Sequence, residues 1–321
     1  MKEKINIFVA DYLHPHGIEL LKKKFNVIVL PQSNNKSLIQ KISSYGKSKS
    51  ALVVRSTRKV DAVFVSSLAR NTGIKLVCTV STGYDNIDLN ACRKYGIKAM
   101  NVAGANSIAA AEFTMALMLA ITKSIIPADR DMKKGKFESG FFSNTELNGK
   151  TIGIIGVGRI GSKVAKLSRA FGMNILGNDI KQSVRLKHKN IRFVSLQALL
   201  SGSDFVTIHT PLDSSTYHLL NSSNLKKLKK GAVVLNCSRG GTIDERALLK
   251  ALRSGKAGYA GVDVFENEPA FNKQFTRLSN VILTPHLAGK TIESKERMAI
   301  EAARKIIKFY AKKLTSAELI N

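Results

Sequence analysis

Three short polar stretches, each directly after an apolar run, carry the side chains that could do chemistry in this sequence. They read N-C-S-R-G-G at 236–241, D-V-F-E-N-E-P at 263–269 and T-P-H-L-A-G at 284–289. An ordinary core would not choose such polar residues where its strands end. Together the stretches supply an arginine, Arg239, a histidine, His286, and acids that include Glu268.

Hydride transfer to a 2-oxo acid requires these three groups. Arg239 would pair with the substrate carboxylate and polarise its carbonyl through a planar, bidentate contact. His286 would donate the proton to the new alkoxide and take it back in the reverse direction. Glu268, on the other imidazole nitrogen, would hold the ring in one tautomer. Taken singly, the three also fit a surface arginine, a solvated loop acid and a core histidine, so the chemistry depends on a common site.

A glycine-rich turn within residues 151–179 predicts what would supply the hydride. The segment begins T-I-G-I-I-G-V-G-R-I-G, which is a buried strand, a turn and the start of an amphipathic helix. Gly156 permits the tight turn, Gly158 lets the backbone approach a pyrophosphate, and Gly161 lets the helix lie close to the sheet. We expect a larger side chain to fail at all three. The helix, which begins near Ile160, would point its free N–H groups at the phosphates.

An acid ends the strand that follows this helix. Asp179 lies 18 residues beyond Gly161, where a carboxylate accepts the ribose hydroxyls of NAD and repels the 2′-phosphate of NADP. A bare glycine pattern also fits an ordinary strand-turn-helix corner. Because strand, helix and acid all occur in register, the sequence predicts a dinucleotide site that prefers NAD.

Alternating strands and helices should position these groups. Short β-branched runs separated by helical patterns predict two mostly parallel sheets with helices on both faces. The first hundred residues carry five predicted strands: Ile5–Val9, Val27–Leu30, Ala51–Val54, Lys75–Val80 and Lys98–Val102. After the dinucleotide unit come four more: Asp204–His209, Ala232–Asn236, Tyr259–Phe265 and Val281–Thr284. Ligands bind outside the carboxyl ends of such strands, so the polar stretches should converge on the glycine turn.

Two longer helices flank the second sheet. The helix predicted from Asn106 is apolar on most faces, so we expect it to be buried between domains or between subunits. The last stretch, Thr291 to Leu314, is also predicted to be helical.

Composition indicates a globular protein. The chain has 321 residues, of which 44% are hydrophobic and 23% charged, a profile that excludes a disordered chain. Its longest apolar region is too short to span a bilayer, and no signal peptide precedes the first strand, so we expect a cytoplasmic protein without a membrane span. The three cysteines are far apart and lack metal-ligand spacing, so neither a disulfide nor a metal site is predicted.

The net charge of +28 is the least ordinary global feature. It raises nucleic acid as a partner. The lysines are scattered, however, and no zinc finger, RNA-binding aromatic motif or long basic arm occurs. We therefore expect no nucleic-acid partner, and a surface that attracts small anionic ligands.

The chain resembles the D-isomer-specific 2-hydroxyacid dehydrogenases over nearly its whole length. Beside the three polar stretches, the resemblance is carried in order by R-S-T at 55–57, S-T-G-Y-D-N-I-D at 81–88, N-S-I-A-A-A-E at 106–112, E-L-N-G-K-T-I-G-I-I-G-V-G-R-I-G at 146–161 and H-T-P-L at 209–212. Several motifs in one order are far more specific than any one of them.

The resemblance implies a role for each matching residue. Arg239 would orient the substrate, His286 would be the acid and base, and Glu268 its partner. Contacts with NAD are implied for the glycine turn and for Arg159, Ile160, Asp179, Thr82, Thr210, Cys237, Ser238 and Asp263, the last near the nicotinamide carboxamide. Contacts with a small anionic substrate are implied for Arg239, Arg55, and the backbone N–H groups of Ser81, Thr82 and Gly83.

The family also implies a discontinuous architecture. A Rossmann NAD-binding domain at 103–288 would be inserted into a flavodoxin-like catalytic domain made of 1–102 and 289–321, with the substrate in the cleft between them. A homodimer is implied as well, with the Asn106 helix and the arm after it near the two-fold axis.

Within the family the sequence looks most like the 3-phosphoglycerate dehydrogenase branch, which forms 3-phosphohydroxypyruvate in the first step of serine synthesis. Arg55 is then the expected phosphate partner. Thr79 and Ser139 stand where relatives of that branch can carry arginine. Reduction of glyoxylate, hydroxypyruvate or another 2-oxo acid is therefore the alternative.

Two further expectations concern regulation and function class. The chain ends soon after its last predicted helix, so we expect the short form without a regulatory domain and no feedback control by serine. An NAD-sensing interaction protein is the alternative of another class, and the intact set of arginine, acid and histidine favours turnover over it.

Overall fold

The computed structural model describes residues 5–30, 33–137, 140 and 144–321. The chain divides into two compact units. Unit 1 consists of Met1–Asn106 and Thr291–Asn321, and unit 2 of Ser107–Lys290. The second unit is thus inserted into the first. The sequence predicted that the chain passes from one domain to the other after residues 102 and 288. In the structure it does so after residues 106 and 290.

Unit 1 is built on a five-stranded parallel sheet of order β2-β1-β3-β4-β5, the flavodoxin-like order. Its strands are β1 (Asn6–Val9), β2 (Asn26–Val29), β3 (Ser50–Val54), β4 (Ile74–Thr79) and β5 (Lys98–Met100). Its helices are α1 (Pro15–Lys22), α2 (Asn35–Ser43), α3 (Ala62–Asn71), α4 (Leu89–Lys94) and α12 (Ile292–Tyr310). All five predicted strands are present, and apolar clusters cover both faces of the sheet.

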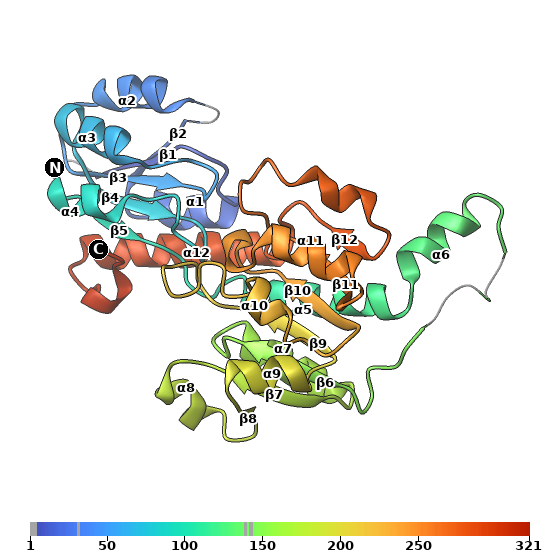
Figure 1. Ribbon diagram of the computed structural model, residues 1–321. Helices are drawn as coiled ribbons and strands as arrows, with labels where there is room; N and C mark the ends of the chain where they lie inside the picture. The colour runs from blue at the N-terminus through green and yellow to red at the C-terminus, as the bar shows by residue number, and fades with distance from the viewer. Residues whose placement is uncertain (1–4, 31–32, 138–139, 141–143) are drawn as a thin grey trace. The chain divides into compact units, whose positions relative to one another are not determined.

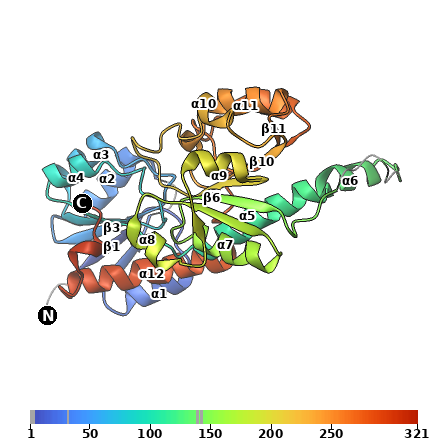
Figure 2. The ribbon, with the colours of Figure 1, turned by 60° about the horizontal axis from the view of Figure 1, so that its bottom comes forward.

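The last helix returns to the beginning of the chain. α12 lies alongside α1 (Figures 1 and 2). The two helices approach so closely at Gly17 that a Cβ there would lie 2.8 Å from the backbone oxygen of Ala299. Ala299, Ala302 and Ala303 are buried in the same cluster as β1 and β4, so α12 completes one face of this sheet.

Unit 2 is built on a seven-stranded parallel sheet of order β12-β11-β10-β9-β6-β7-β8. Its strands are β6 (Thr151–Ile155), β7 (Asn174–Asn178), β8 (Arg192–Phe193), β9 (Phe205–Ile208), β10 (Ala232–Asn236), β11 (Ala257–Val262) and β12 (Val281–Leu283). Its helices are α5 (Ser107–Thr122), α6 (Ile125–Met132), α7 (Gly161–Ala170), α8 (Gln182–Lys187), α9 (Leu196–Gly202), α10 (Ser222–Leu225) and α11 (Glu245–Arg253). The strand order reverses between β6 and β9, as in the Rossmann fold.

Helix α5 is buried for a different reason from the one expected. It packs on α7, β10 and β11, and Leu117 lies against Gly261 of the sheet. Its buried side chains are therefore covered largely by its own unit, and a contact of this helix with a second subunit stays a prediction. Helix α6 is the opposite case, because none of its residues is buried and it extends away from the rest of unit 2 (Figure 1).

No single helix among the described residues is long and apolar enough to cross a membrane. α5 and α6 together pass that test of length and composition, but they are bent by 59°.

Candidate active site

The carboxyl ends of the strands in unit 2 all face one edge of the sheet, because every strand pair is parallel. The segments that follow them carry the residues singled out in the sequence. In the order of the sheet they are His286 after β12, Asp263 after β11, Arg239 after β10, Thr210 after β9, Gly156 after β6 and Asp179 after β7. This edge includes the point where the strand order reverses, which is where open α/β sheets bind ligands.

The glycine turn is required by the protein itself at two of its three positions. Gly156 has a φ of +85°, and a Cβ there would lie 2.9 Å from the backbone of His209. A Cβ on Gly161 would overlap the carbonyl oxygen of Gly156, so the helix can begin this close only with glycine. At Gly158 a Cβ would meet no protein atom within 4 Å. The prediction that a larger side chain fails at all three therefore holds on protein packing only for Gly156 and Gly161.

A row of free N–H groups follows the turn. Among the described residues, the backbone nitrogens of Gly158, Arg159, Ile160 and Gly161 donate no hydrogen bond to the protein. Helix α7 begins at Gly161, and no side chain caps its end. Free amides and the positive end of the helix dipole form an anion site, which fits the diphosphate of a dinucleotide.

Asp179 lies beside this turn and is held there. One carboxylate oxygen accepts a hydrogen bond from the amide of Val157 at 2.9 Å, and the other accepts one from the amide of Lys181 at 2.8 Å. The acid is thereby fixed at the end of β7, where a ribose would lie. The preference of this site for NAD over NADP stays a prediction. The reason is that a cation lies beside the acid: Arg185 donates a hydrogen bond to the main-chain carbonyl of Asp179.

Two buried polar atoms at the end of β9 have no partner in the described structure. They are Nδ1 of His209 and Oγ1 of Thr210. Both residues lie beside the glycine turn, since a Cβ on Gly156 would lie 2.9 Å from His209 and 3.0 Å from Thr210. Burial lowers the pKa of His209 to about 4, so the ring is neutral near pH 7 and not a competing acid and base. Unused buried donors and acceptors beside the anion site fit a dinucleotide, which would satisfy them.

His286 and Glu268 form a close pair at the end of β12. Nδ1 of His286 lies 2.7 Å from Oε2 of Glu268, while Oε1 of the acid accepts the amide of Phe265 at 3.0 Å. Burial raises the pKa of Glu268, but the hydrogen bonds from His286 and Phe265 and the charge of Arg239 outweigh it and lower the pKa overall. An ionised carboxylate only accepts, so Nδ1 carries the proton and Nε2 remains for a substrate.

A buried aspartate builds the turn that carries His286. Asp263 is fully buried, and its carboxylate accepts hydrogen bonds from the hydroxyl of Thr284 at 2.6 Å and from the amides of Leu287 and Ala288 at 2.7 and 2.9 Å. His286 itself adopts a φ of +53°, a left-handed conformation that non-glycine residues rarely take. Asp263 thus organises the histidine turn, a role that no spacing indicated. Its expected position near the nicotinamide stays a prediction.

Arg239 lies near Glu268 because their two segments make a close backbone contact. A Cβ on Gly240 would collide with the backbone of Phe265 and Glu266, so the 236–241 and 263–269 segments can approach only because this residue is glycine. The carbonyl of Arg239 accepts hydrogen bonds from Asn236 at 3.0 Å and from Thr242 at 2.7 Å. Arginine, acid and histidine thus lie on neighbouring segments within unit 2.

Two residues near Arg239 that were predicted to contact the cofactor have side chains that are buried or hydrogen-bonded within the protein. Cys237 is buried in the core, and burial raises the pKa of its thiol to about 12. The hydroxyl and amide of Ser238 both donate to the side chain of Asn236, at 2.9 and 3.0 Å. Asn236 was missed in the sequence, although an asparagine two residues before a serine after a strand is typical of such a turn.

The predicted substrate loop, Ser81 to Gly83, lies in unit 1 just after β4. All three of its carbonyls accept hydrogen bonds: Ser81 from the amide of Val102 at 2.9 Å, Thr82 from the side chain of Asn101 at 2.6 Å, and Gly83 from the hydroxyl of Ser81 at 2.6 Å. The three amides of the loop donate to no acceptor within the part of the chain that the structure describes. Consecutive free amides form a concave anion site that suits a carboxylate.

Comparison with known proteins identifies the family. Residues 115–288 match the family model described as D-isomer specific 2-hydroxyacid dehydrogenase, NAD binding domain. The chain belongs to the D-isomer specific 2-hydroxyacid dehydrogenases. Its inserted unit therefore contains the NAD-binding domain of that family, and NAD is its cofactor.

Relatives of the chain include phosphoglycerate dehydrogenases and reductases of hydroxypyruvate or glyoxylate. It is 37% identical over 306 residues to a D-3-phosphoglycerate dehydrogenase of Archaeoglobus fulgidus, covering 94% of the chain but only 57% of that relative. It is 38% identical over 309 residues to a hydroxypyruvate reductase of Thermotoga maritima, covering 95% of the chain and 98% of the relative. A solved glyoxylate reductase of Paecilomyes thermophila matches all of the chain and 98% of that structure, with a TM-score of 0.85 and 27% identity. The chain thus spans little more than half the length of the phosphoglycerate relative.

The arginines after β3 of the dehydrogenase have different surroundings. Arg58 is almost entirely committed, since its guanidinium donates to both carboxylate oxygens of Asp11, at 2.7 and 3.0 Å, and to Asn35 at 2.9 Å. The guanidinium of Arg55 has no hydrogen bond or ion pair among the described residues, whereas its backbone is held by Asp11 and Asn86. The backbone of Arg55 is therefore fixed, whereas its guanidinium has no partner among the described residues.

The two positions where the phosphoglycerate branch can carry arginine add no cation here. Thr79 is fully buried, and its hydroxyl is bonded to that of Ser81 at 2.8 Å. Ser139 lies outside the described residues.

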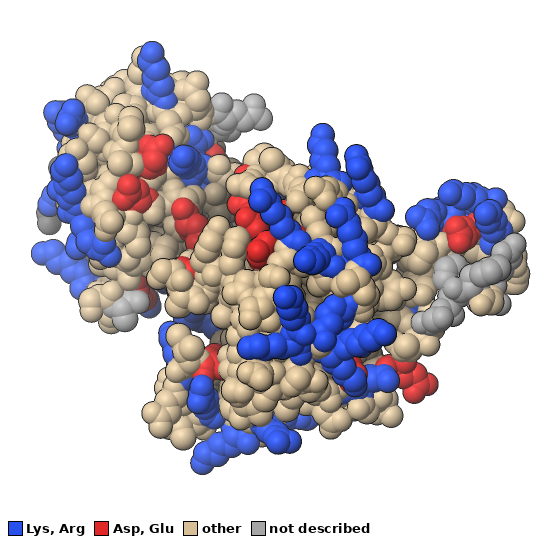
Figure 3. Space-filling view, viewed as in Figure 1, with Lys and Arg blue, Asp and Glu red and all other residues tan. Residues whose placement is uncertain are grey.

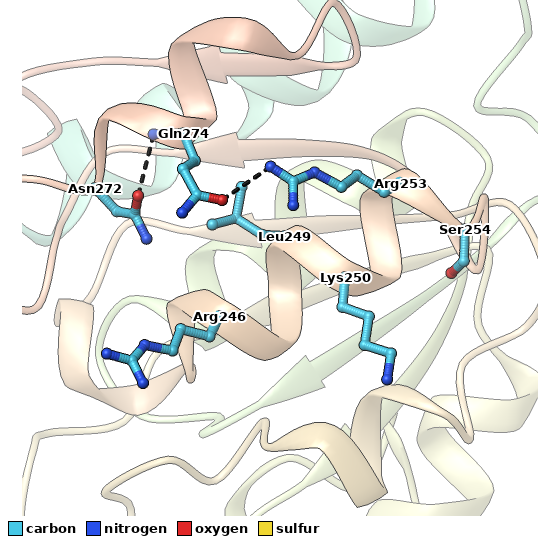
Figure 4. Close-up of a pocket in the computed structure, with 7 residues that line it drawn as sticks. All are labelled: Arg246, Leu249, Lys250, Arg253, Ser254, Asn272 and Gln274. Carbon is cyan, nitrogen blue, oxygen red and sulfur yellow. Dashed lines mark hydrogen bonds between the residues drawn. The ribbon is translucent and has the colours of Figure 1, made fainter.

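On the face of the molecule seen in Figure 3, lysine and arginine side chains are spread widely over the surface. One concentration of such side chains lines a hollow of about 680 Å³ on α11, where Arg246, Lys250 and Arg253 project from the helix and Gln274 bonds Arg253 (Figure 4). None of the predicted catalytic or cofactor residues lines this hollow. Among the described residues no cluster of histidine, cysteine and acid could hold a metal ion.

Proposed function

We propose that the protein interconverts a D-2-hydroxy acid and its 2-oxo acid with NAD. The observation that carries this proposal is the His286–Glu268 pair beside Arg239, held at the strand ends that also carry the dinucleotide turn. A scaffold that only binds NAD would not need a histidine fixed in one tautomer. The family to which the chain belongs supports turnover as well.

The mechanism assigns one task to each side chain. When bound, the nicotinamide supplies or accepts the hydride. Glu268 holds Nδ1–H of His286, so that Nε2 delivers a proton to the nascent alkoxide during reduction and removes it during oxidation. Arg239 pairs with the substrate carboxylate and polarises the carbonyl. In unit 1, the amides of Ser81 to Gly83, which donate to no acceptor among the described residues, form an anion site that suits a carboxylate.

As the specific substrate we infer 3-phosphoglycerate, with 3-phosphohydroxypyruvate as its oxo acid. Arg55 supports this choice, because its backbone is held by Asp11 and Asn86 while its guanidinium, which has no partner among the described residues, is suited to a phosphate. A phosphate carries close to two negative charges, so one unpaired arginine near the substrate loop would discriminate strongly between phosphorylated and unphosphorylated acids.

Hydroxypyruvate or glyoxylate is the second candidate. The buried Thr79 adds no cation to the loop, so any phosphate clamp rests largely on Arg55. The chain also matches the hydroxypyruvate reductase over nearly the full length of both proteins.

The two candidates predict different orders of kcat/KM for phosphohydroxypyruvate, hydroxypyruvate and glyoxylate, measured with NADH. If phosphate is recognised, Arg55→Met should lower kcat/KM for phosphohydroxypyruvate about 10- to 100-fold, the value of a hydrogen-bonded charge pair, and leave glyoxylate nearly unchanged. Lys59→Met, which removes an exposed cation nearby, is the matched control. A wild type that prefers hydroxypyruvate or glyoxylate would move the proposal to the second candidate. NADH binding without turnover of any of the three would instead favour an NAD-sensing protein.

We also propose that the protein is a homodimer built on α6. Ile125, Ile126 and Met132 are about half exposed on a helix that buries none of its residues, which a second copy could cover. Sedimentation velocity should give twice the mass of one chain, and Ile125→Glu with Ile126→Glu should halve it. A wild type that sediments as a monomer at micromolar concentration would contradict this assembly.

A further inference from the structure

Lys305 is a buried lysine in the apolar face of α12. It is 8% exposed, and its only hydrogen bond among the described residues is from Nζ to the carbonyl of Asn101, at 3.0 Å. Its helical neighbours Ala302 and Ile306 are buried in the same apolar cluster. The lysine also lies close enough to Cys78, at the end of β4, to affect its thiol. Burial raises the pKa of that thiol to about 12, and the positive charge of Lys305 opposes the rise.

Packing does not explain a lysine at this place. An ammonium group has three N–H donors and loses its hydration on burial, which is costly unless it is paired. No acid pairs with Lys305 among the described residues. A methionine would fill the same space without that cost, and replacing buried charges by apolar residues is often neutral or stabilising. The amine is therefore not there for stability.

The hydrogen bonds that begin at Lys305 lead to the substrate loop. Asn101, whose carbonyl the lysine binds, is buried and donates its side-chain amide to the carbonyl of Thr82 at 2.6 Å. The next residue, Val102, donates its amide to the carbonyl of Ser81. These two bonds turn the carbonyls of Ser81 and Thr82 towards residues 101–102, and the amides of the loop have no acceptor among the described residues.

We propose that Lys305 is a positioning residue for the substrate carboxylate. By binding the carbonyl of Asn101, Lys305 fixes the peptide to which the carbonyls of Ser81 and Thr82 are hydrogen-bonded, and it places a buried positive charge at that peptide. The proposal rests on the proposed function, because it assumes that this loop binds the carboxylate. A misplaced loop should weaken binding of substrate and transition state alike, so the effect belongs in KM.

The test replaces Lys305 by methionine, which keeps the length and removes donor and charge. For the preferred 2-oxo acid, KM should rise about tenfold or more, with kcat and the KM for NADH little changed. Lys305→Gln retains an N–H donor and should recover part of the KM. Arg304→Met is the matched control, because Arg304 is the exposed cation next in sequence on α12. The melting temperature of Lys305→Met should not fall.

A second readout does not depend on turnover. Hydrogen exchange of a peptide spanning residues 98–106 should be faster in Lys305→Met than in wild type, with the rest of unit 1 unchanged. The reason is that the Asn101–Val102 peptide, whose amide donates to Ser81, is no longer held at its carbonyl by Lys305. An unchanged KM, or faster exchange spread over all of unit 1, would overturn the positioning role. A wild type without 2-oxo acid turnover would remove the proposed function, whereas local exchange at 98–106 would still show that Lys305 holds the loop.

Discussion

Replacing His286 by alanine should lower kcat/KM for the preferred 2-oxo acid by roughly 10²- to 10⁴-fold, the usual contribution of a positioned acid and base. The ring is held by Glu268 at 2.7 Å and by a turn built around the buried Asp263, so a neighbouring side chain cannot readily replace it. The loss should appear in kcat, because proton transfer occurs in the transition state. Stopped-flow measurement of NADH oxidation at saturating substrate would isolate that step.

The chain contains its own control for this experiment. His16 lies 2.7 Å from Glu296, the same pair of groups at the same distance, but the two residues lie on helices α1 and α12 of unit 1 and belong to no predicted site. His16→Ala should leave kcat/KM unchanged. Glu268→Gln should cost less than His286→Ala, since an amide oxygen can still accept Nδ1–H. Near-normal turnover in His286→Ala would exclude the histidine as the acid and base.

Replacing Arg239 by methionine should have a loss of similar size, roughly 10²- to 10⁴-fold in kcat/KM, because about two charge-assisted hydrogen bonds of 1.5–3 kcal/mol each disappear. Arg239→Lys should fall between this variant and wild type, since an ammonium keeps the charge but not the planar fork. The backbone of residue 239 is fixed by Asn236 and Thr242, so the substitution should not move the loop. Steady-state kinetics with varied 2-oxo acid measure the change.

Cofactor affinity separates this interpretation from a structural one. Binding of NADH, followed by its fluorescence, should be nearly the same in Arg239→Met and wild type if the arginine serves the substrate. Equal losses of NADH affinity and of turnover would instead indicate that the loop has collapsed, and normal turnover would remove Arg239 from the mechanism.

Much of this architecture could be predicted because the decisive signals are local. Apolar β-branched runs and turn residues determine strands, and parallel strands bring their carboxyl ends to one edge. The predicted order of polar stretches after β10, β11 and β12 therefore placed Arg239, Glu268 and His286 correctly in one region. The glycine turn was readable for the same reason, since a positive φ and a close helix approach both require glycine.

What the sequence did not reveal depends on partners far apart in the chain. The bonds from Asp263 to Thr284 and to the turn around His286 cross more than 20 residues, and no spacing rule describes them. The apolar faces of α5 gave no indication of which surface would cover them, and the sequence analysis looked beyond the unit that does so. The prediction that packing requires glycine at position 158 was wrong, because a Cβ there would have no described protein atom within 4 Å.

The insertion of one unit into the other has a consequence for synthesis of the chain. The first unit has made its five strands by Met100, yet the face that α12 covers stays open until the ribosome reaches about Tyr310. The inserted unit is continuous in sequence, so it can complete its core during that interval, when the earlier strands still expose apolar surface to chaperones and to aggregation. Translation therefore finishes the N-terminal fold last.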